Sequence, residues 1–164
     1  MKLEINASNV FALAEDIERS ATDFYQRAAK ITTDPNCREL FKTLAAIEEV
    51  HEDIFFDMRR EGSPATQPSS TSDSQGEFTT APSRLSAQVI KEQIEKAFQD
   101  SETSEQILHR AMDFERQTVI LFKSLRDSLK RRGEQNRVNQ IIGEEMDLVL
   151  MLAEALASAR PAEA

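Results

Sequence analysis

Glu48 and His51 are the pair of residues in this chain whose types and spacing most clearly suggest chemistry. They are three residues apart in a segment with a helical pattern, so both side chains lie on the same face of one helix. The other residues of that face, at spacings of three and four, are Phe41, Leu44, Phe55 and Met58. This spacing is typical of the seam that a helix buries against its neighbours. Because an isolated buried carboxylate costs several kcal/mol, Glu48 requires a partner charge or a metal ion.

Three more glutamates stand in the same frame in other helical segments: Glu18, Glu115 and Glu145. The positions seven and four residues before each glutamate, and three, seven and ten residues after it, hold no other acidic residue. Glu18 and Glu48 are 30 residues apart, and so are Glu115 and Glu145. The pattern predicts a duplicated helical hairpin whose buried carboxylates surround one site.

Composition places the chain among single-domain helical proteins. Of its 164 residues 40% are hydrophobic and 30% charged, with four glycines and no tryptophan, which fits a helical bundle with one core. The net charge of −9 argues against nucleic acid or an anionic membrane as a partner. The single Cys37 excludes an internal disulfide, and no apolar run approaches the ~18 residues of a membrane span. The N-terminal residues also lack the apolar core of a signal peptide, so we expect a cytoplasmic protein.

Helical periodicity predicts four long helices, at about residues 8–31, 35–60, 104–131 and 135–158. Asp34 and Pro35 provide a start for the second helix, and Thr103 with Gln106 forms a capping box before the third. Gly133 is a natural stop for the third helix. The short connections make each pair of helices antiparallel neighbours.

The long connection at 61–103 differs in composition from the rest of the chain. It is rich in Ser, Thr and Pro over 62–83, and a short amphipathic helix is predicted at about 84–99. A four-helix bundle with a single long crossover requires a connection of this kind. Residues 1–164 are therefore interpreted as one all-α domain, a four-helix bundle with an extra short helix.

Four glutamates at one level of a bundle axis cannot all remain ionised without a cation. One or two divalent metal ions, bound by carboxylate oxygens and a nitrogen of His51, would resolve the repulsion. This arrangement resembles the ferritin-like di-iron carboxylate proteins, in which two helices supply Glu and two supply Glu-x-x-His. The segments ERSATDFY, IEEVH and AMDFERQTVILF are most similar to the rubrerythrin branch. The resemblance covers about residues 8–60 and 104–156.

The resemblance implies an iron protein with ferroxidase or peroxidase-like chemistry. Its implied partners are O₂ or peroxide, an external electron donor, and further copies of the chain in a homo-oligomer. Tyr25 resembles a tyrosine of the family that hydrogen-bonds a ligand or lends an electron, although core packing explains it equally well. The implied metal ligands are Glu18, Glu48, His51, Glu115 and Glu145.

The sequence departs from this family pattern most clearly at Leu148, where a second histidine is expected three residues after Glu145. One ion would then have only oxygen ligands, which suit Mn²⁺ as well as iron. Asp147 would compensate if the helix were rotated. Glu144 with Asp147 imitates the Glu-x-x-His spacing, but that register brings Arg137, Gln140 and Glu154 inward, and we reject it. No rubredoxin-like Cys₄ domain is present.

Two other functional classes are compatible with these residues. One is a metal-poor scaffold that acts in binding or assembly, with Leu148 marking the lost site. The other is iron storage or delivery within an oligomer. Outside the predicted site, His109 lies off the Glu115 seam and is expected to be exposed, and Cys37 is expected to be an inert packing residue.

Overall fold

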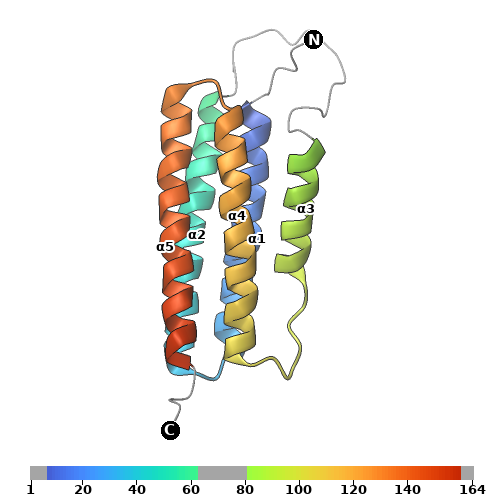
Figure 1. Cartoon of the computed structure of the whole chain (residues 1–164), viewed down its shortest axis with the longest axis vertical. Helices are drawn as coiled ribbons and strands as arrows, with labels where there is room; N and C mark the ends of the chain where they lie inside the picture. Colours follow the sequence, from blue (N-terminus) through green and yellow to red (C-terminus); the bar gives the residue numbers. More distant parts are fainter. Residues whose placement is uncertain (1–6, 63–80, 160–164) are drawn as a thin grey trace.

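The computed structural model describes residues 7–62 and 81–159, which form a bundle of long antiparallel helices with one short helix beside it (Figure 1). This is the all-α architecture predicted from the sequence. The helices of the described residues are α1 (Ala7–Ile31), α2 (Pro35–Gly62), α3 (Ala81–Glu95), α4 (Ser104–Ser128) and α5 (Arg132–Ala159). Most of the predicted Ser/Thr/Pro-rich connection, at 63–80, lies outside the described residues.

Side-chain caps begin α2 and α4 where the sequence places them. The carboxylate of Asp34 accepts hydrogen bonds from the backbone N–H groups of Asn36, at 2.8 Å, and Cys37, at 3.1 Å. The Thr103 hydroxyl accepts from the N–H of Gln106, whose side chain in turn accepts from the N–H of Thr103. Both caps satisfy N–H groups that the first turn of a helix leaves without partners.

The turn between α4 and α5 differs from the prediction. The α4 helix ends at Ser128, three residues earlier than predicted, and Gly133 lies in the first turn of α5. Leu129 has extended backbone, and its side chain is buried at 4% exposure. The Gln135 side chain donates a 2.6 Å hydrogen bond to the Leu129 carbonyl. The burial of Leu129 therefore ends α4 before the glycine is reached.

The short helix α3 ends at Glu95, four residues before the predicted end. Arginines from the bundle hold the carbonyl groups at this end, with Arg110 donating to Lys96 at 2.6 Å and Arg27 to Ile94 at 3.5 Å. Phe98 follows the helix and packs on Phe24, with 5.0 Å between ring centroids. These contacts with residues distant in sequence favour a loop where periodicity alone predicts further helix.

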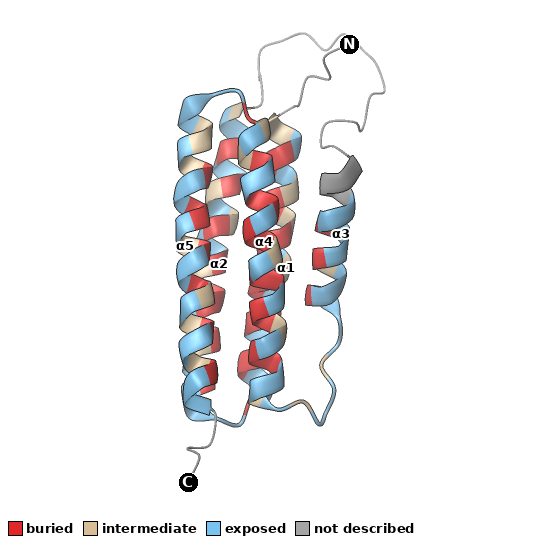
Figure 2. Cartoon of the chain, viewed as in Figure 1, coloured by how far each residue is buried: buried red, intermediate tan, exposed pale blue. Residues whose placement is uncertain are grey.

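The core lies on the inward faces of the four long helices (Figure 2). The α3 helix covers the seam between α1 and α4 with its buried residues Ala87, Ile90 and Ile94. The opposite seam, between α2 and α5, opens as a groove. The bundle is thus closed by α3 on one side and accessible on the other.

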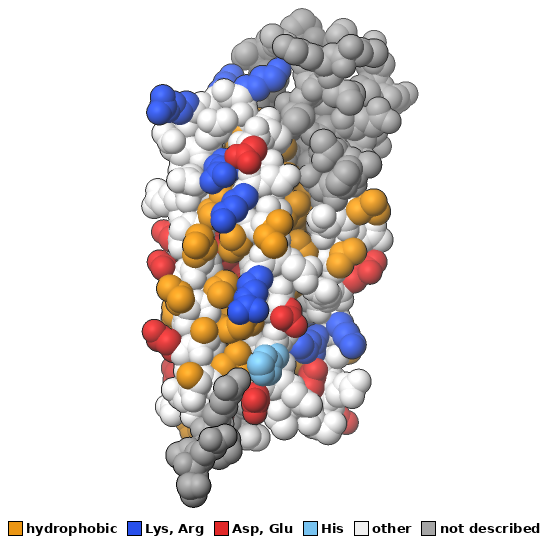
Figure 3. Space-filling model, in the orientation of Figure 1, with side chains coloured by type: hydrophobic (Ala, Val, Ile, Leu, Met, Phe, Trp, Pro, Cys, Tyr) orange, Lys and Arg blue, Asp and Glu red, His pale blue; other side chains and the backbone are white. Residues whose placement is uncertain are grey.

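The surface of the described helices is mixed in character. Figure 3 shows basic, acidic and apolar side chains interspersed on one face of the bundle, so the described part of that face lacks a continuous basic patch for a nucleic acid backbone. Within residues 7–62 and 81–159, no helix is both long enough and apolar enough to cross a membrane.

Candidate metal centre

Four of the five residues predicted as metal ligands meet in the core: Glu18 of α1, Glu48 and His51 of α2, and Glu145 of α5. Each offers one ligand atom, and these atoms all lie within 4.8 Å of one another. Their exposures are 1% or less. The heptad-like frame explains the convergence, because it points each side chain from its own helix toward the bundle axis.

His51 connects the two halves of the bundle. Its Nδ1 lies 2.8 Å from Oε1 of Glu145 and 3.3 Å from Oε2 of Glu48. Its Nε2 lies 2.9 Å from Oε2 of Glu144, on the other side of the ring. The imidazole is therefore held between carboxylates at both nitrogens.

Several carboxylate oxygens of this cluster have no hydrogen-bond partner. They are buried and belong to Glu18 (Oε1), Glu48 (both oxygens) and Glu145 (Oε2). Buried polar atoms almost always have a partner, and a charged one left alone costs several kcal/mol. Oxygens without partners beside an imidazole nitrogen form a donor set that fits a divalent transition metal ion.

Burial and mutual repulsion disfavour the ionised state of these carboxylates in the absence of a cation. The pKa of Glu18 is raised well above its usual value by burial and then by the charges of Glu145 and Glu48. Burial and the charge of Glu115 raise the pKa of Glu48 to about 7, although the nearby His51 imidazole opposes this rise. The pKa of Glu145 is also raised, by burial and by Glu48.

The same contacts act in the opposite way on the imidazole. Burial alone would lower the pKa of His51, but the hydrogen bond to Glu145 and the adjacent carboxylate of Glu48 outweigh it and raise the pKa to about 11. The ring is therefore protonated at neutral pH when no metal is bound, and it donates from both nitrogens. This proton is the charge that offsets the carboxylates in the metal-free core.

Glu115, the fifth predicted ligand, is buried at 1% exposure and interacts with Glu145 and Glu48, but it does not belong to the group of four. The Tyr25 hydroxyl donates a 2.6 Å hydrogen bond to its Oε1. Burial and the charge of Glu145 raise the pKa of Glu115 well above its usual value. Tyr25 is itself fully buried and stacks on Phe41, so the packing and polar interpretations of this residue both apply.

The structure settles the register of α5 around the missing histidine. Glu145 faces the core at 0% exposure and Leu148 at 1%, whereas Asp147 is exposed. Asp147 therefore does not replace the histidine by rotation of the helix, and the register with Glu144 and Asp147 in the core is excluded.

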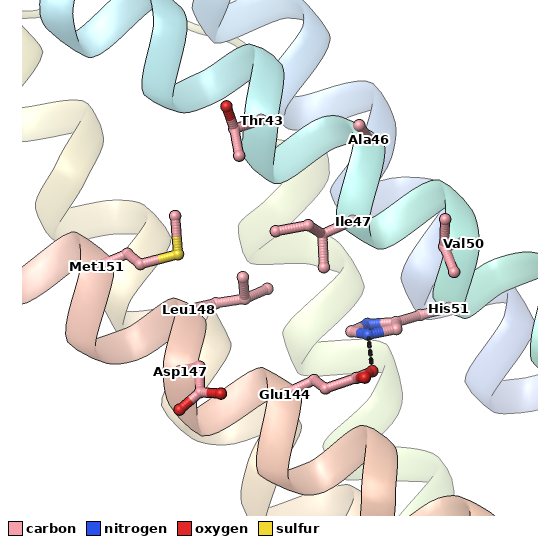
Figure 4. Close-up of a pocket in the computed structure, with 9 residues that line it drawn as sticks. All are labelled: Thr43, Ala46, Ile47, Val50, His51, Glu144, Asp147, Leu148 and Met151. Atoms are coloured by element: carbon pink, nitrogen blue, oxygen red, sulfur yellow. Dashed lines mark hydrogen bonds and ion pairs between the residues drawn. The ribbon is translucent and has the colours of Figure 1, made fainter.

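Sequence reasoning weighed Glu144 only as a core residue of the rejected register and missed its contact with His51. Its side chain is 45% exposed, and it reaches the outer nitrogen of His51 from the rim of the groove between α2 and α5 (Figure 4). Because successive residues of a helix are about 100° apart, a residue next to a core position lies at the edge of the seam. The only sequence feature that pointed to this contact was a carboxylate at such an edge position.

The remaining histidine and the cysteine lie outside this cluster. His109 is exposed, as expected, with Nε2 3.8 Å from a carboxylate oxygen of Glu105. Cys37 is a buried free thiol whose pKa is raised by burial and by Asp34.

Comparison with known proteins agrees with this architecture. The rubrerythrin family model matches residues 9–145. A solved structure from Thermotoga maritima, described as a ferritin-like diiron-carboxylate protein, is similar in fold, with a TM-score of 0.69 and 19% sequence identity. The match covers 98% of this chain and 100% of that one. No curated protein matches the chain in sequence. The chain belongs to the rubrerythrin family.

Proposed function

We propose that this protein binds iron in the bundle core and uses it in redox chemistry, oxidising Fe²⁺ with O₂ or reducing a peroxide. One observation carries the proposal. Three buried glutamates with oxygens that lack hydrogen-bond partners, and one imidazole nitrogen, lie within 4.8 Å of one another on three helices. The ligands of the tight site are Glu18, Glu48, His51 and Glu145.

The donor set favours a first-row transition metal over Mg²⁺ or Ca²⁺. Carboxylates alone would suit the harder cations, but an imidazole ligand adds affinity for iron and the metals that follow it. Manganese is the nearest competitor, because it also accepts ligand sets rich in oxygen. When bound, iron supplies the Fe²⁺/Fe³⁺ couple through which O₂ or peroxide is reduced.

The protein contributes position, charge and exclusion of water. The Tyr25 hydroxyl donates to one oxygen of Glu115 and so holds this carboxylate in position. The apolar packing of Phe41, Phe114 and Phe122, each at 1% exposure or less, limits water in the core. Return of the oxidised centre to its reduced state requires an external electron donor, and we expect the protein to work as a homo-oligomer.

Anaerobic Fe²⁺ titration by calorimetry tests the proposal. The wild type is expected to bind iron tightly, and His51→Leu to lose this binding because the only nitrogen ligand is removed. His109→Leu is the matched control, since His109 is exposed and lies outside the cluster. Thermal melting of each metal-free variant shows whether it has folded.

Oxygen and peroxide consumption by the Fe²⁺-loaded protein then tests the redox part. Consumption that exceeds the rate for free Fe²⁺ and is lost in His51→Leu supports it. A folded wild type that binds no iron would instead favour the scaffold interpretation.

A further inference from the structure

The groove between α2 and α5 contains two side-chain pairs that are related by the internal repeat of the chain. It has a volume of about 590 Å³, and His51 is one of the residues that line it. In the first pair, Glu144 immediately precedes Glu145, and His51 follows Glu48 by three residues. These two side chains are hydrogen-bonded across the groove at 2.9 Å (Figure 4).

The second pair has the same relation with the two helices exchanged. Ile47 immediately precedes Glu48, and Leu148 follows Glu145 by three residues. Both line the groove, with Leu148 buried at 1% exposure and Ile47 half-buried against the core (Figure 4). Where the first pair is an imidazole with its carboxylate partner, the second pair is entirely apolar.

We propose that this core is built for one resident metal ion and that Glu144 is the positioning residue of His51. At the place for a second ion, Leu148 stands where the nitrogen ligand would be, and Ile47 stands where the hydrogen-bond partner of that ligand would be. The inference rests on the proposed function, because it concerns the same site. It departs from the two-ion stoichiometry that a diiron relative suggests.

The position of Glu144 beside the outer nitrogen of His51 suits it to orient the ring. A histidine that binds a metal through one nitrogen commonly donates its other N–H to a carboxylate, which fixes the orientation of the ring. The contact of Glu144 with Nε2 fixes the ring so that Nδ1 faces Glu145 and Glu48. Since the Glu144 side chain is 45% exposed, shortening it opens no cavity in the core.

The case against a tight second ion rests on the residues around Leu148. Of the five predicted ligands, only Glu115 lies outside the group of four and would be left to hold a second ion. One oxygen of Glu115 is already bonded to Tyr25. Leu148 offers no ligand atom to a metal ion, and Ile47 offers no acceptor to the N–H group of an imidazole introduced at position 148.

Calorimetry with Co²⁺ as a redox-stable probe tests the role of Glu144. The wild type is expected to bind one ion per chain, and Glu144→Leu to bind it about 10- to 100-fold more weakly, as for other partners of metal-bound histidines. Glu144→Gln keeps an oxygen acceptor and should restore part of the affinity. Asp147→Asn removes a charge from the same groove and should stay within about twofold of the wild type.

The proton on Nε2 of His51 provides a readout that does not depend on metal. In the metal-free wild type its NMR resonance should lie far downfield, because the N–H donates to a carboxylate. Glu144→Leu should move it upfield, whereas Asp147→Asn should leave it in place. Equal affinities and unchanged resonances in Glu144→Leu would overturn the positioning role.

Substitutions at Ile47 and Leu148 test why a second metal ion is not bound tightly. Leu148→His alone is expected to retain one tight ion, because the new ring lacks a partner, and Ile47→Glu alone should do the same. The double variant Ile47→Glu/Leu148→His should bind two ions, the second at least tenfold more tightly than in Leu148→His. A second tight ion in Leu148→His alone would contradict the claim that both an imidazole and its carboxylate partner are required.

The stoichiometry of the wild type separates this inference from the proposed function. One tight ion supports both. Two equally tight ions would overturn the inference and leave iron binding intact. No bound ion in the folded wild type would overturn the proposed function, and the inference with it.

Discussion

The metal-free protein should become less stable as the pH rises from 5 to 8, and Glu48 should account for a large part of the change. In the unfolded chain this carboxyl has its ordinary pKa of 4.5, whereas in the folded core burial and Glu115 raise the pKa to about 7. Between these values the folded state keeps a proton that the unfolded state releases. The free energy of unfolding therefore falls as the pH rises through this window.

The size of the effect follows from the two pKa values. Each pKa unit corresponds to about 1.4 kcal/mol, so a rise from 4.5 to about 7 makes the folded state about 3 kcal/mol less stable above pH 7 than below pH 4.5. For a chain of 164 residues this lowers Tm by roughly 6–12 °C. The raised pKa values of Glu18 and Glu115 act in the same direction. So does His51, whose stabilising proton is present below pH 6.5 and lost as the pH rises through about 11.

Urea denaturation with chelator present, at pH 5, 6, 7 and 8, measures this dependence. Glu48→Gln should flatten it and should be more stable than the wild type at pH 8, because one repelling charge is gone. Glu49→Gln is the matched control, since Glu49 is the adjacent exposed acid on the same helix. A free energy of unfolding that rises from pH 5 to 8 would refute the reasoning, as would an equal flattening by Glu49→Gln.

Three further predictions concern single contacts. Tyr25→Phe leaves the buried Glu115 oxygen without its donor and should lower the free energy of unfolding by about 1–3 kcal/mol in urea denaturation; no change would mean that Tyr25 only fills space. Thr103→Ala removes the cap of α4 and should cost about 1 kcal/mol in thermal melting, with little effect on metal binding; a loss of metal affinity would contradict a local role. Metal binding at pH 7 should release at least one proton per ion, because His51 must lose its Nδ1 proton, and its affinity should increase with pH. Calorimetry in two buffers of different ionisation enthalpy measures this release, and heats independent of buffer would exclude it.

The burial of the glutamates could be predicted because it depends on local periodicity. Glu18, Glu48, Glu115 and Glu145 each stand alone in an apolar frame, and the two equal separations place them at one level of the bundle. A helix buries its apolar stripe wherever the partner helices lie, so this part of the architecture needs no knowledge of tertiary contacts. Whether these residues bind metal is still a prediction.

The details that sequence reasoning missed depend on contacts between distant segments. Periodicity assigns a residue to the core or to the surface, and Glu144 belongs to neither, since it reaches His51 from an exposed rim. Tyr25 was expected near a ligand, but its partner Glu115 is 90 residues away in the chain and could not be chosen in advance. The early end of α4 likewise depends on the burial of Leu129, and no turn-forming residue at that position predicts it from the sequence.

The most direct test of iron binding is anomalous diffraction at the iron absorption edge from a crystal soaked anaerobically in Fe²⁺. One strong peak is expected among Glu18, Glu48, His51 and Glu145, within bonding distance of Nδ1 of His51, with the Nε2 contact to Glu144 preserved. Two peaks of equal height would contradict the one-ion inference. A fully soaked crystal with no peak beside His51 would contradict the central claim that this core is an iron site.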